Sequence, residues 1–257
     1  MTLLEAAAFI ALGLVAGSYG TLIGVGGGLL VVPALLLMHA APKEAAGSSM
    51  AVVLANAVSG SLTYLRQRRI DVRAGLIFAL AGLPGALLGG FVDQNVPKRL
   101  FSLLFALLLA GIGLRLVLRP GRDEAEAAIA DGHSTAGFRP GLAALIGLGT
   151  GFLASMFGIG GGLIFVPSLV YMFAFPAHVA TATSTFIIAL TALFGTASHA
   201  YYHDVLWGPT ALIASGAIAG AQVGARLAPR VRGSQLLRIF AVAVLLVALW
   251  LFYKAVG

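Results

Sequence analysis

Long apolar stretches separated by short polar breaks make up most of the chain. They cover residues 3–38, 45–65, 74–92, 100–118, 141–173, 180–198, 208–227 and 236–253. Most are close to the ~20 residues that a helix needs to cross a bilayer. Two stretches, 3–38 and 141–173, are too long for one crossing, and each contains a glycine cluster followed by a proline. The pattern therefore predicts a bundle of membrane-spanning helices.

The composition supports this interpretation. Of the 257 residues, 60% are hydrophobic and only 10% are charged, and the mean hydropathy is +1.00. Soluble domains carry about 25% charged residues, so this chain has too few polar side chains to cover a water-exposed surface. A soluble enzyme and a DNA-binding domain are excluded. The net charge of +7 is therefore assigned to cytoplasmic loops rather than to nucleic-acid binding.

The two halves of the chain repeat each other. Residues 13–35 read GLVAGSYGTLIGVGGGLLVVPAL, and residues 147–169 read GLGTGFLASMFGIGGGLIFVPSL. A polar stretch separates the halves, so we expect a first repeat over 1–118, a linker over 119–139 and a second repeat over 140–257. Pairs of small residues four positions apart are expected to let helices pack closely: Gly13 and Gly17, Gly85 and Gly89, Gly147 and Gly151, Gly220 and Gly224.

Equivalent loops of the two halves carry opposite charge bias. The segment 66–73 is rich in arginine, whereas its counterpart 199–208 has no lysine or arginine. The next loop reverses the contrast, because 226–238 is rich in arginine and has no acid. Loops with excess positive charge stay in the cytoplasm. The repeats are therefore predicted to have inverted topology, with the linker 119–139 in the cytoplasm and both termini on the outer side.

This topology requires stretches 3–38 and 141–173 each to enter and leave at one face. Each is therefore predicted to be a helical hairpin bent at its glycine cluster. Residues 29–38 would span about 15 Å as a helix, which is about half the thickness of the hydrocarbon core of a bilayer. This length favours a chain that descends to about mid-membrane and then continues as a half-helix. The expected fold is an all-α polytopic membrane protein with two inverted-topology repeats, each a glycine-rich broken or re-entrant hairpin followed by three transmembrane helices.

The glycine clusters are the main candidate binding site. Non-helical backbone at membrane depth is tolerated only where protein buries it or where it lines a watery cavity. Glycine permits close approach of a ligand to the main chain, and the first amides of a half-helix lack intrahelical partners and attract anions. We therefore predict one central anion site between two such helix starts, although close helix packing is the alternative. The predicted ligands are Gly24, Gly26, Gly27, Gly28, Gly158, Gly160, Gly161 and Gly162.

The polar residues near the clusters are mostly hydroxyl-bearing. They are candidates for completing the hydrogen bonds of an anion, with bonds to their own helix backbone as the alternative. These candidates are Thr21 and Ser155, just before each cluster, and Ser48, Ser49, Thr183 and Ser184, near the start of the following span. Pro33 and Pro167 are expected to tighten or kink the first turn of each half-helix.

No charged residue lies in the middle of a predicted span. This argues against a proton pump with a buried carboxylate relay and against a cation channel with acidic rings. His199 and His203 are four residues apart and precede Asp204, so a helix would place both imidazoles on one face, as a metal pair requires. A transition-metal or other small-solute transporter using these three residues is the alternative function. Protonation sensing and an ordinary solvated loop edge are the other interpretations of the segment.

The two G-x-G-G-G-L-x-x-V-P blocks are each followed, about twenty residues later, by Gly47-Ser48-Ser49 or Ala182-Thr183-Ser184. With these motifs nearly the whole chain resembles the sulfite exporter TauE/SafE family of membrane transporters. The resemblance implies transport of small, chiefly sulfur-containing anions. It also implies functional positions at 24–29 with Pro33 and at 158–163 with Pro167, which adds Leu29 and Leu163 to the candidate site. Gly47-Ser48-Ser49 departs from the more usual Thr-Ser pair of the family.

The sequence thus predicts a secondary transporter that moves sulfite, thiosulfate, a sulfonate or a related anion across the bacterial inner (plasma) membrane by alternating access. The chain has no nucleotide-binding or catalytic motif, so we expect neither an enzyme nor a cofactor. The expected partners are the anion and the lipid bilayer, and not nucleic acid. A coupling proton or sodium ion and a second copy in a homodimer are left open, as is a non-transporting membrane scaffold.

Overall fold

The computed structural model describes residues 3–97 and 138–231, together with scattered positions within 99–114 and 242–249. All regular structure in the two continuous ranges is helical, as predicted. Four predicted spans form long helices: α3 (Pro42–Arg66), α4 (Val72–Asp93), α9 (Ala177–Tyr201) and α10 (Trp207–Leu227), which ends in a 3-10 turn at Ala228–Arg230. The predicted spans 100–118 and 236–253, and most of the linker 119–139, lie outside the described residues.

Each of the two overlong stretches forms two helices that meet at its glycine cluster. The first gives α1 (Leu3–Ile23) and α2 (Gly28–Leu37), and the second gives α7 (Pro140–Phe157) and α8 (Gly162–Phe173). The second arms are short, as expected for half-helices. The first arms are longer than a chain that descends only to mid-membrane would need, because the 21 residues of α1 rise about 31 Å. In the described part of the chain, six helices are long and apolar enough to cross a membrane, and α1 and α7 are among them.

Local sequence signals place several helix starts. Pro42 opens α3, and the Glu44 carboxylate accepts a hydrogen bond of 2.9 Å from the Ala41 amide. Asp71 caps α4 by accepting a hydrogen bond of 2.9 Å from the Ala74 amide. Such caps satisfy amides that a helix start leaves without partners. They explain why the polar breaks between the apolar stretches coincide with turns.

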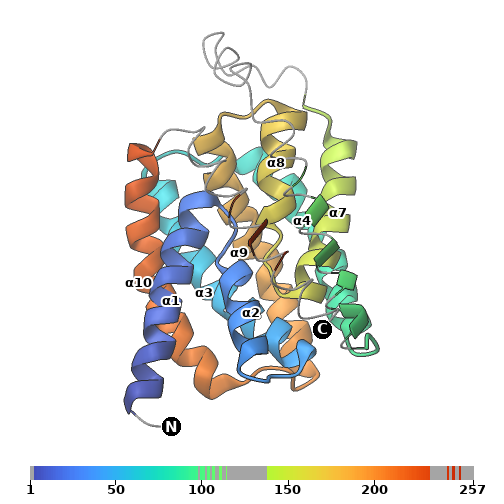
Figure 1. Cartoon of the computed structure of the whole chain (residues 1–257). Coiled ribbons are helices and arrows are strands. Elements are labelled where there is room, and N and C mark those ends of the chain that lie inside the picture. The colour runs from blue at the N-terminus through green and yellow to red at the C-terminus, as the bar shows by residue number, and fades with distance from the viewer. Residues whose placement is uncertain are drawn as a thin grey trace.

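The helices form two flanking pairs around a central pair (Figure 1). The flanking pairs are α1 with α10 and α4 with α7, and the central pair is α3 with α9. The short helices α2 and α8 start in the middle of the molecule and run toward opposite ends (Figure 1). Helices at equivalent positions of the two halves run in opposite directions in the same view: α1 runs away from the end where the chain starts, whereas α7 runs toward it.

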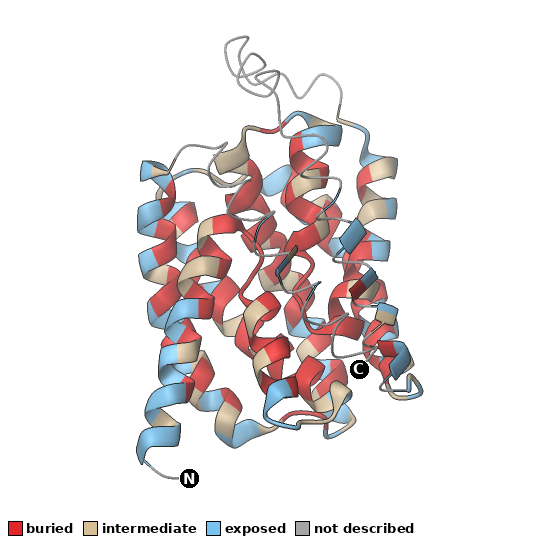
Figure 2. Ribbon diagram, viewed as in Figure 1, coloured by how far each residue is buried: buried red, intermediate tan, exposed pale blue. Residues whose placement is uncertain are grey.

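The outer faces of the bundle are apolar. Figure 2 shows buried residues concentrated in the middle of the helices and exposed ones on the outer faces and at both ends. Large hydrophobic side chains such as Val15, Leu80 and Phe91 are more than half exposed on these outer faces. A surface of this kind is unfavourable in water and favourable against lipid tails. The structure therefore agrees with a multi-pass membrane protein.

The two ends of the bundle differ in charge. The end where α3 and α10 finish and α4 and α7 begin carries one described acid, Asp71, and many arginines (Figure 1). Those described arginines are Arg66, Arg68, Arg69, Arg73, Arg139, Arg226 and Arg230. The described charged residues of the opposite end are four acids and two cations: Glu5, Lys43, Glu44, Asp93, Arg99 and Asp204. The segments 66–73 and 226–230 therefore lie at one end, where the predicted topology puts both in the cytoplasm.

Glycines line the seams between the flanking helices. A Cβ atom on Gly85 would lie within 3.0 Å of the Leu148 carbonyl oxygen, and one on Gly220 would lie as close to that of Leu14. The same holds for the other paired glycines of these seams: Gly13, Gly17, Gly89, Gly147, Gly151 and Gly224. The packing role predicted for these pairs is confirmed. Because the neighbours are backbone atoms, they cannot move aside for a larger side chain.

Gly85→Ala should therefore destabilise the folded protein, whereas Gly149→Ala should not. Gly149 is a matched control because it lies in α7 beside Leu148, and its added Cβ would meet nothing within 4 Å. We expect a loss of about 1–3 kcal/mol for Gly85→Ala from overpacking and no loss, or a gain of up to about 1 kcal/mol, for Gly149→Ala from helix propensity. Thermal unfolding of the purified protein in detergent measures both. Equal stabilities would show that the seam is not tightly packed in solution.

Candidate functional site

Two glycine loops, residues 24–27 and 158–161, connect the arms of the hairpins. Backbone φ is positive at three glycines in each loop: Gly24, Gly26 and Gly27 in the first, and Gly158, Gly160 and Gly161 in the second. L-residues with a Cβ adopt this region only at a cost. Gly27 and Gly161 directly precede α2 and α8, with φ of 85° in each case. The clusters therefore consist of glycine because the chain must reverse direction there and start a new helix.

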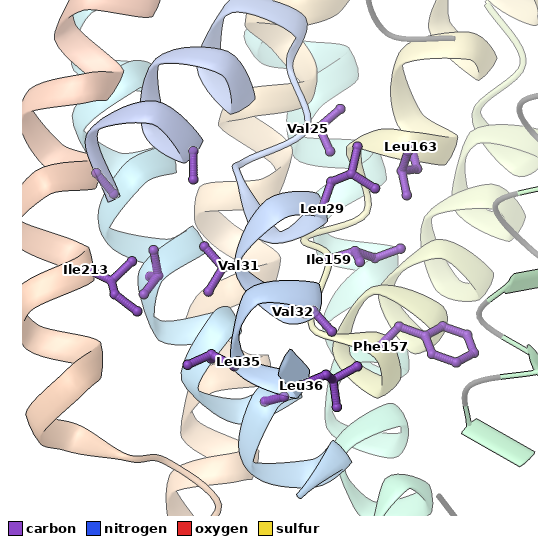
Figure 3. Packing of buried hydrophobic residues seen from close by; sticks show 14 of the residues in the cluster. Val25, Leu29, Val31, Val32, Leu35, Leu36, Phe157, Ile159, Leu163 and Ile213 are labelled. Carbon is purple, nitrogen blue, oxygen red and sulfur yellow. The ribbon is translucent and has the colours of Figure 1, made fainter. Parts of the chain in front are cut away.

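The loops contact each other at the centre of the bundle. A Cβ on Gly28, the first residue of α2, would lie within 3.0 Å of the Gly158 carbonyl oxygen, and one on Gly162 would lie as close to the Gly24 carbonyl oxygen. Each loop thus presents a carbonyl group to the start of the other short helix. That arrangement is favourable because a helix start carries unpaired amides and partial positive charge. Figure 3 shows Val25 beside Leu163, with Ile159 close to α2.

Two serine hydroxyls hold these same carbonyl groups. Ser49 Oγ donates to the Gly158 oxygen at 2.6 Å, and Ser184 Oγ donates to the Gly24 oxygen at 2.7 Å. Both serines are fully buried. Each serine comes from the long central helix of one half and binds the loop of the other half. The two predicted site residues therefore lie at the loops, where they bond the protein backbone in this conformation.

Ser48 and Thr183, the residues before these serines, also make a matched pair of contacts. Ser48 Oγ accepts a hydrogen bond of 2.9 Å from the Leu206 amide, and Thr183 Oγ1 accepts one of 3.0 Å from the Asp71 amide. Both amides belong to the turns that lead into α10 and α4. The polar pairs predicted from sequence thus link each loop to a turn at one end of the bundle.

Thr21 and Ser155 lie one turn before the loops, and both are buried. Thr21 Oγ1 donates to Asn56 Oδ1 at 3.1 Å, whereas the Ser155 hydroxyl has no hydrogen-bond partner in the described structure. Their carbonyl groups are held in parallel ways. Tyr64 Oη donates to the Thr21 oxygen at 2.9 Å, and His199 Nε2 donates to the Ser155 oxygen at 3.0 Å.

Sequence reasoning missed Tyr64. Its repeat equivalent is His199, at the offset that relates Ser48 to Thr183 and Ser49 to Ser184, so applying that offset to His199 would have found it. Tyrosine in an apolar helix otherwise carries no signal of a functional role, because its ring packs well in any core.

The space expected between the two helix starts is filled in this conformation. A Cβ on Gly26 or on Gly160 would meet the Val53 and Ile188 side chains, at distances between 2.6 and 3.3 Å. Leu29 and Leu163 are buried in the apolar packing around the loops, and Pro33 and Pro167 lie inside α2 and α8. The structure therefore brings the glycine loops, Ser49 and Ser184 together at the buried centre in a closed arrangement. Ser48 and Thr183 bond the turns at the two ends, and Pro167 is only partly buried.

The helix starts keep amides that no carbonyl of the same helix reaches. In α2 the amides of Leu30 and Val31 bond the Gly27 oxygen, so the Gly28 and Leu29 amides are left without an intrahelical partner. In α8 the corresponding bonds run from Ile164 and Phe165 to the Gly161 oxygen. The nearest described neighbours of the loop glycines are backbone atoms and uncharged side chains. The region thus offers hydrogen-bond donors without fixed charge.

The histidine pair does not form a metal site. Helix α9 ends at Tyr201, and His203 adopts a positive φ of 60° in the following turn. His199 is fully buried while His203 is exposed, so the two imidazoles do not share a helix face. Among the described residues, no group of three or more His, Cys, Asp or Glu side chains is placed to hold a metal ion. The interpretation of His199 as part of a solvated loop edge is also wrong.

Comparison with known proteins places these features in a family. Residues 9–251 match the family described as Sulfite exporter TauE/SafE. "Probable membrane transporter protein YunE" of Bacillus subtilis (strain 168) is 31% identical to this chain over an alignment of 265 positions, which covers 96% of the chain and 97% of that protein.

Two further relatives extend the comparison. A "Probable membrane transporter protein" of Xylella fastidiosa (strain 9a5c) is 31% identical over 247 residues, which cover 95% of this chain and 93% of that protein. "Probable membrane transporter protein MJ0441" of Methanocaldococcus jannaschii is 29% identical over 204 residues, which cover 74% of this chain and 70% of that protein. No solved structure matches the chain. The chain belongs to the sulfite exporter TauE/SafE family, and it is a multi-pass membrane transporter.

Proposed function

We propose that the protein is a secondary transporter of small sulfur-containing anions, such as sulfite, thiosulfate or a sulfonate, and that the anion binds between the starts of α2 and α8. The observation that carries the proposal is the convergence of these two helix starts at one buried point lined by uncharged groups. Helix starts attract anions through their free amides and dipoles. The family description, Sulfite exporter TauE/SafE, favours sulfur-containing anions over others.

The proposed anion site needs the two loops to separate. In the structure the Gly24 and Gly158 carbonyl groups occupy the positions at the helix starts that an anion would take. An anion that enters would take the place of these carbonyl groups beside the Gly28 and Leu29 amides, which have no partner within α2. We therefore interpret the structure as a closed conformation. Alternating access would open the contact between the loops first toward one end of the bundle and then toward the other.

The proposal includes inverted topology and a location in the bacterial inner membrane. Two observations support it: equivalent helices of the two halves run in opposite directions in Figure 1, and seven of the eight described arginines, all except Arg99, lie at one end. By the positive-inside rule that end faces the cytoplasm, which puts the linker 119–139 inside and both termini outside. The repeats would then correspond to residues 1–118 and 140–257. Transport would need no cofactor, and the lipid bilayer and the anion would be its partners.

Transport of thiosulfate tests the function directly. Proteoliposomes that contain the purified protein should take up radiolabelled thiosulfate faster than empty liposomes, and excess sulfite should compete because both anions would use the same amides. Choline, a cation of similar size, should not compete. Uptake no faster than that of empty liposomes for thiosulfate, sulfite and taurine alike would contradict a sulfur-anion transporter.

Gly27→Ala should reduce thiosulfate uptake while the protein still inserts and purifies. The alanine Cβ would meet the Ala16 carbonyl oxygen at 2.9 Å, and the φ of +85° costs an L-residue about 1–2 kcal/mol. We expect a loss of about tenfold, since 1.4 kcal/mol corresponds to a factor of ten. Gly149→Ala is the matched control. Wild-type uptake by Gly27→Ala, and by Gly161→Ala in the other loop, would remove the loops from the transport site.

Ser184→Ala should weaken the contact between the loops. It leaves the Gly24 carbonyl group without its buried donor, which costs about 1–3 kcal/mol. Ser49→Ala should have an effect of the same size on the other loop, because it removes the equivalent bond. Ser215→Ala is the control, since Ser215 is exposed and bonds its own helix. Thermal unfolding in detergent measures all three. A stability like that of the control in both loop variants would contradict the structural role of these hydroxyls.

A further inference from the structure

We propose that Asp93, Asp204, His199 and Lys43 form a proton-binding site that couples proton movement to the second glycine loop, residues 158–161. The inference rests on the proposed transport function and names its coupling ion. The four residues come from α4, from the turn between α9 and α10, from α9 and from α3. They lie at the end of the bundle opposite to the one that carries most of the described arginines.

The cluster is buried and centred on Asp204. Asp204 Oδ1 lies 3.4 Å from Lys43 Nζ, and its Oδ2 lies 3.8 Å from His199 Nδ1. Gln94 Nε2 also donates a hydrogen bond to Asp204 Oδ2. Asp204 is 2% exposed and His199 is not exposed, whereas the Lys43 side chain is about half exposed. Lys43 is therefore the member of the cluster that reaches solvent, and it marks the side from which a proton enters.

Asp93 is the group that needs the proton. It is 3% exposed, and neither of its carboxylate oxygens has a hydrogen-bond partner in the described structure. It lies within electrostatic reach of Asp204, which repels its negative charge, and of Lys43, which attracts it. The single lysine is already paired with Asp204. A second ionised carboxylate in this buried place is costly, and a proton taken up from water to form the carboxylic acid removes that charge.

The groups that face Asp93 and Asp204 allow one exchangeable proton. Lys43 on α3 is the only described cation in the cluster. Gln94, just after α4, and Ser155 on α7, which bonds His199, are uncharged. With Lys43 charged and His199 neutral, two ionised aspartates leave one net negative charge. Binding one proton makes the cluster neutral, and releasing it restores the charge.

Short hydrogen-bonded connections link this cluster to the second loop. His199 Nε2 donates to the Ser155 carbonyl oxygen, which also accepts the amide of Gly158, the first residue of the loop, at 3.3 Å. The turn that carries Asp204 is bound to Ser48 through the Leu206 amide. Ser49, the next residue, holds the Gly158 carbonyl group. A movement of Asp204 or His199 on proton uptake therefore displaces the hydrogen-bond partners of both the amide and the carbonyl group of Gly158.

The equivalent position in the first repeat cannot respond in this way. Tyr64 occupies the place of His199 and donates to the Thr21 carbonyl group, which accepts the Gly24 amide at 3.2 Å. At the repeat offset, Arg69 corresponds to Asp204 and Ala228 to Asp93. A phenol keeps its proton at neutral pH. His178 stands at the position of Lys43, but no carboxylate stands at the positions of Asp93 and Asp204. The proposed site therefore acts on the second loop alone and holds one proton.

Infrared difference spectroscopy of the purified protein without any anion tests the site itself. Lowering the pH should produce the band of a buried, protonated carboxylic acid in the wild type, and Asp93→Asn should lose it. Glu44→Gln is the matched control, because Glu44 follows Lys43, is only partly buried and bonds the Ala41 amide outside the cluster, so the variant should leave the band unchanged. A band that persists in Asp93→Asn and in Asp204→Asn would overturn the proposal.

Transport under an imposed pH gradient tests the coupling. Thiosulfate accumulation in wild-type proteoliposomes should increase with the gradient, whereas Asp93→Asn and His199→Gln should show the uptake seen without one. Glutamine keeps an N–H donor for the Ser155 carbonyl group, and His203→Gln, at the exposed histidine, is the control. Gradient-driven accumulation in both cluster variants would overturn the coupling. If thiosulfate is not transported but the infrared band depends on Asp93, the sulfur-anion function fails while the proton site stands.

Discussion

The structure depends on how two stretches of non-helical backbone are satisfied at the centre of an apolar bundle. A loop at this depth lacks the regular bonding of a helix, so its carbonyl groups need other partners. Each half supplies a donor for the other: Ser49 Oγ of the first half donates to the Gly158 carbonyl oxygen, and Ser184 Oγ of the second half donates to the Gly24 carbonyl oxygen. Each of these carbonyl groups also lies at the start of the other short helix. The two halves are therefore bound to each other at the point where the candidate anion site lies.

This reciprocity explains the placement of small residues throughout the molecule. The serines reach the opposite loops because α3 and α9 pack in the centre, which requires the flanking helices to pack closely as well. The glycines of the seams allow that, since an added Cβ at Gly85 or Gly220 would collide with backbone. An opening of the loop contact must then move whole helices, because the glycines of the seams lie against backbone atoms that cannot rearrange locally. Rocking or gating between helix groups is the motion that such packing permits.

Much of the fold was predictable from the sequence, because membrane helices must be long, apolar and separated by polar turns. The breaks at the glycine clusters were predictable for the same reason, since stretches 3–38 and 141–173 exceed one crossing. The role of the candidate residues in binding an anion stays a prediction, and their present contacts were not predictable. Whether Ser184 bonds its own helix, an anion or a distant carbonyl group depends on helix packing. The burial of His199 was also missed, because the end of α9 at Tyr201 is decided by a turn with positive φ at His203.

The central claim is that two oppositely oriented halves meet at the glycine loops, and labelling of single cysteines tests it most directly. The chain has no cysteine, and Arg68 and His203 are exposed at opposite ends of the bundle. In intact cells a membrane-impermeant maleimide should label the protein carrying His203→Cys, and it should label the one carrying Arg68→Cys only after the membrane is permeabilised. Labelling of both positions from the same side would contradict the inverted arrangement and, with it, the meeting of two helix starts from opposite faces.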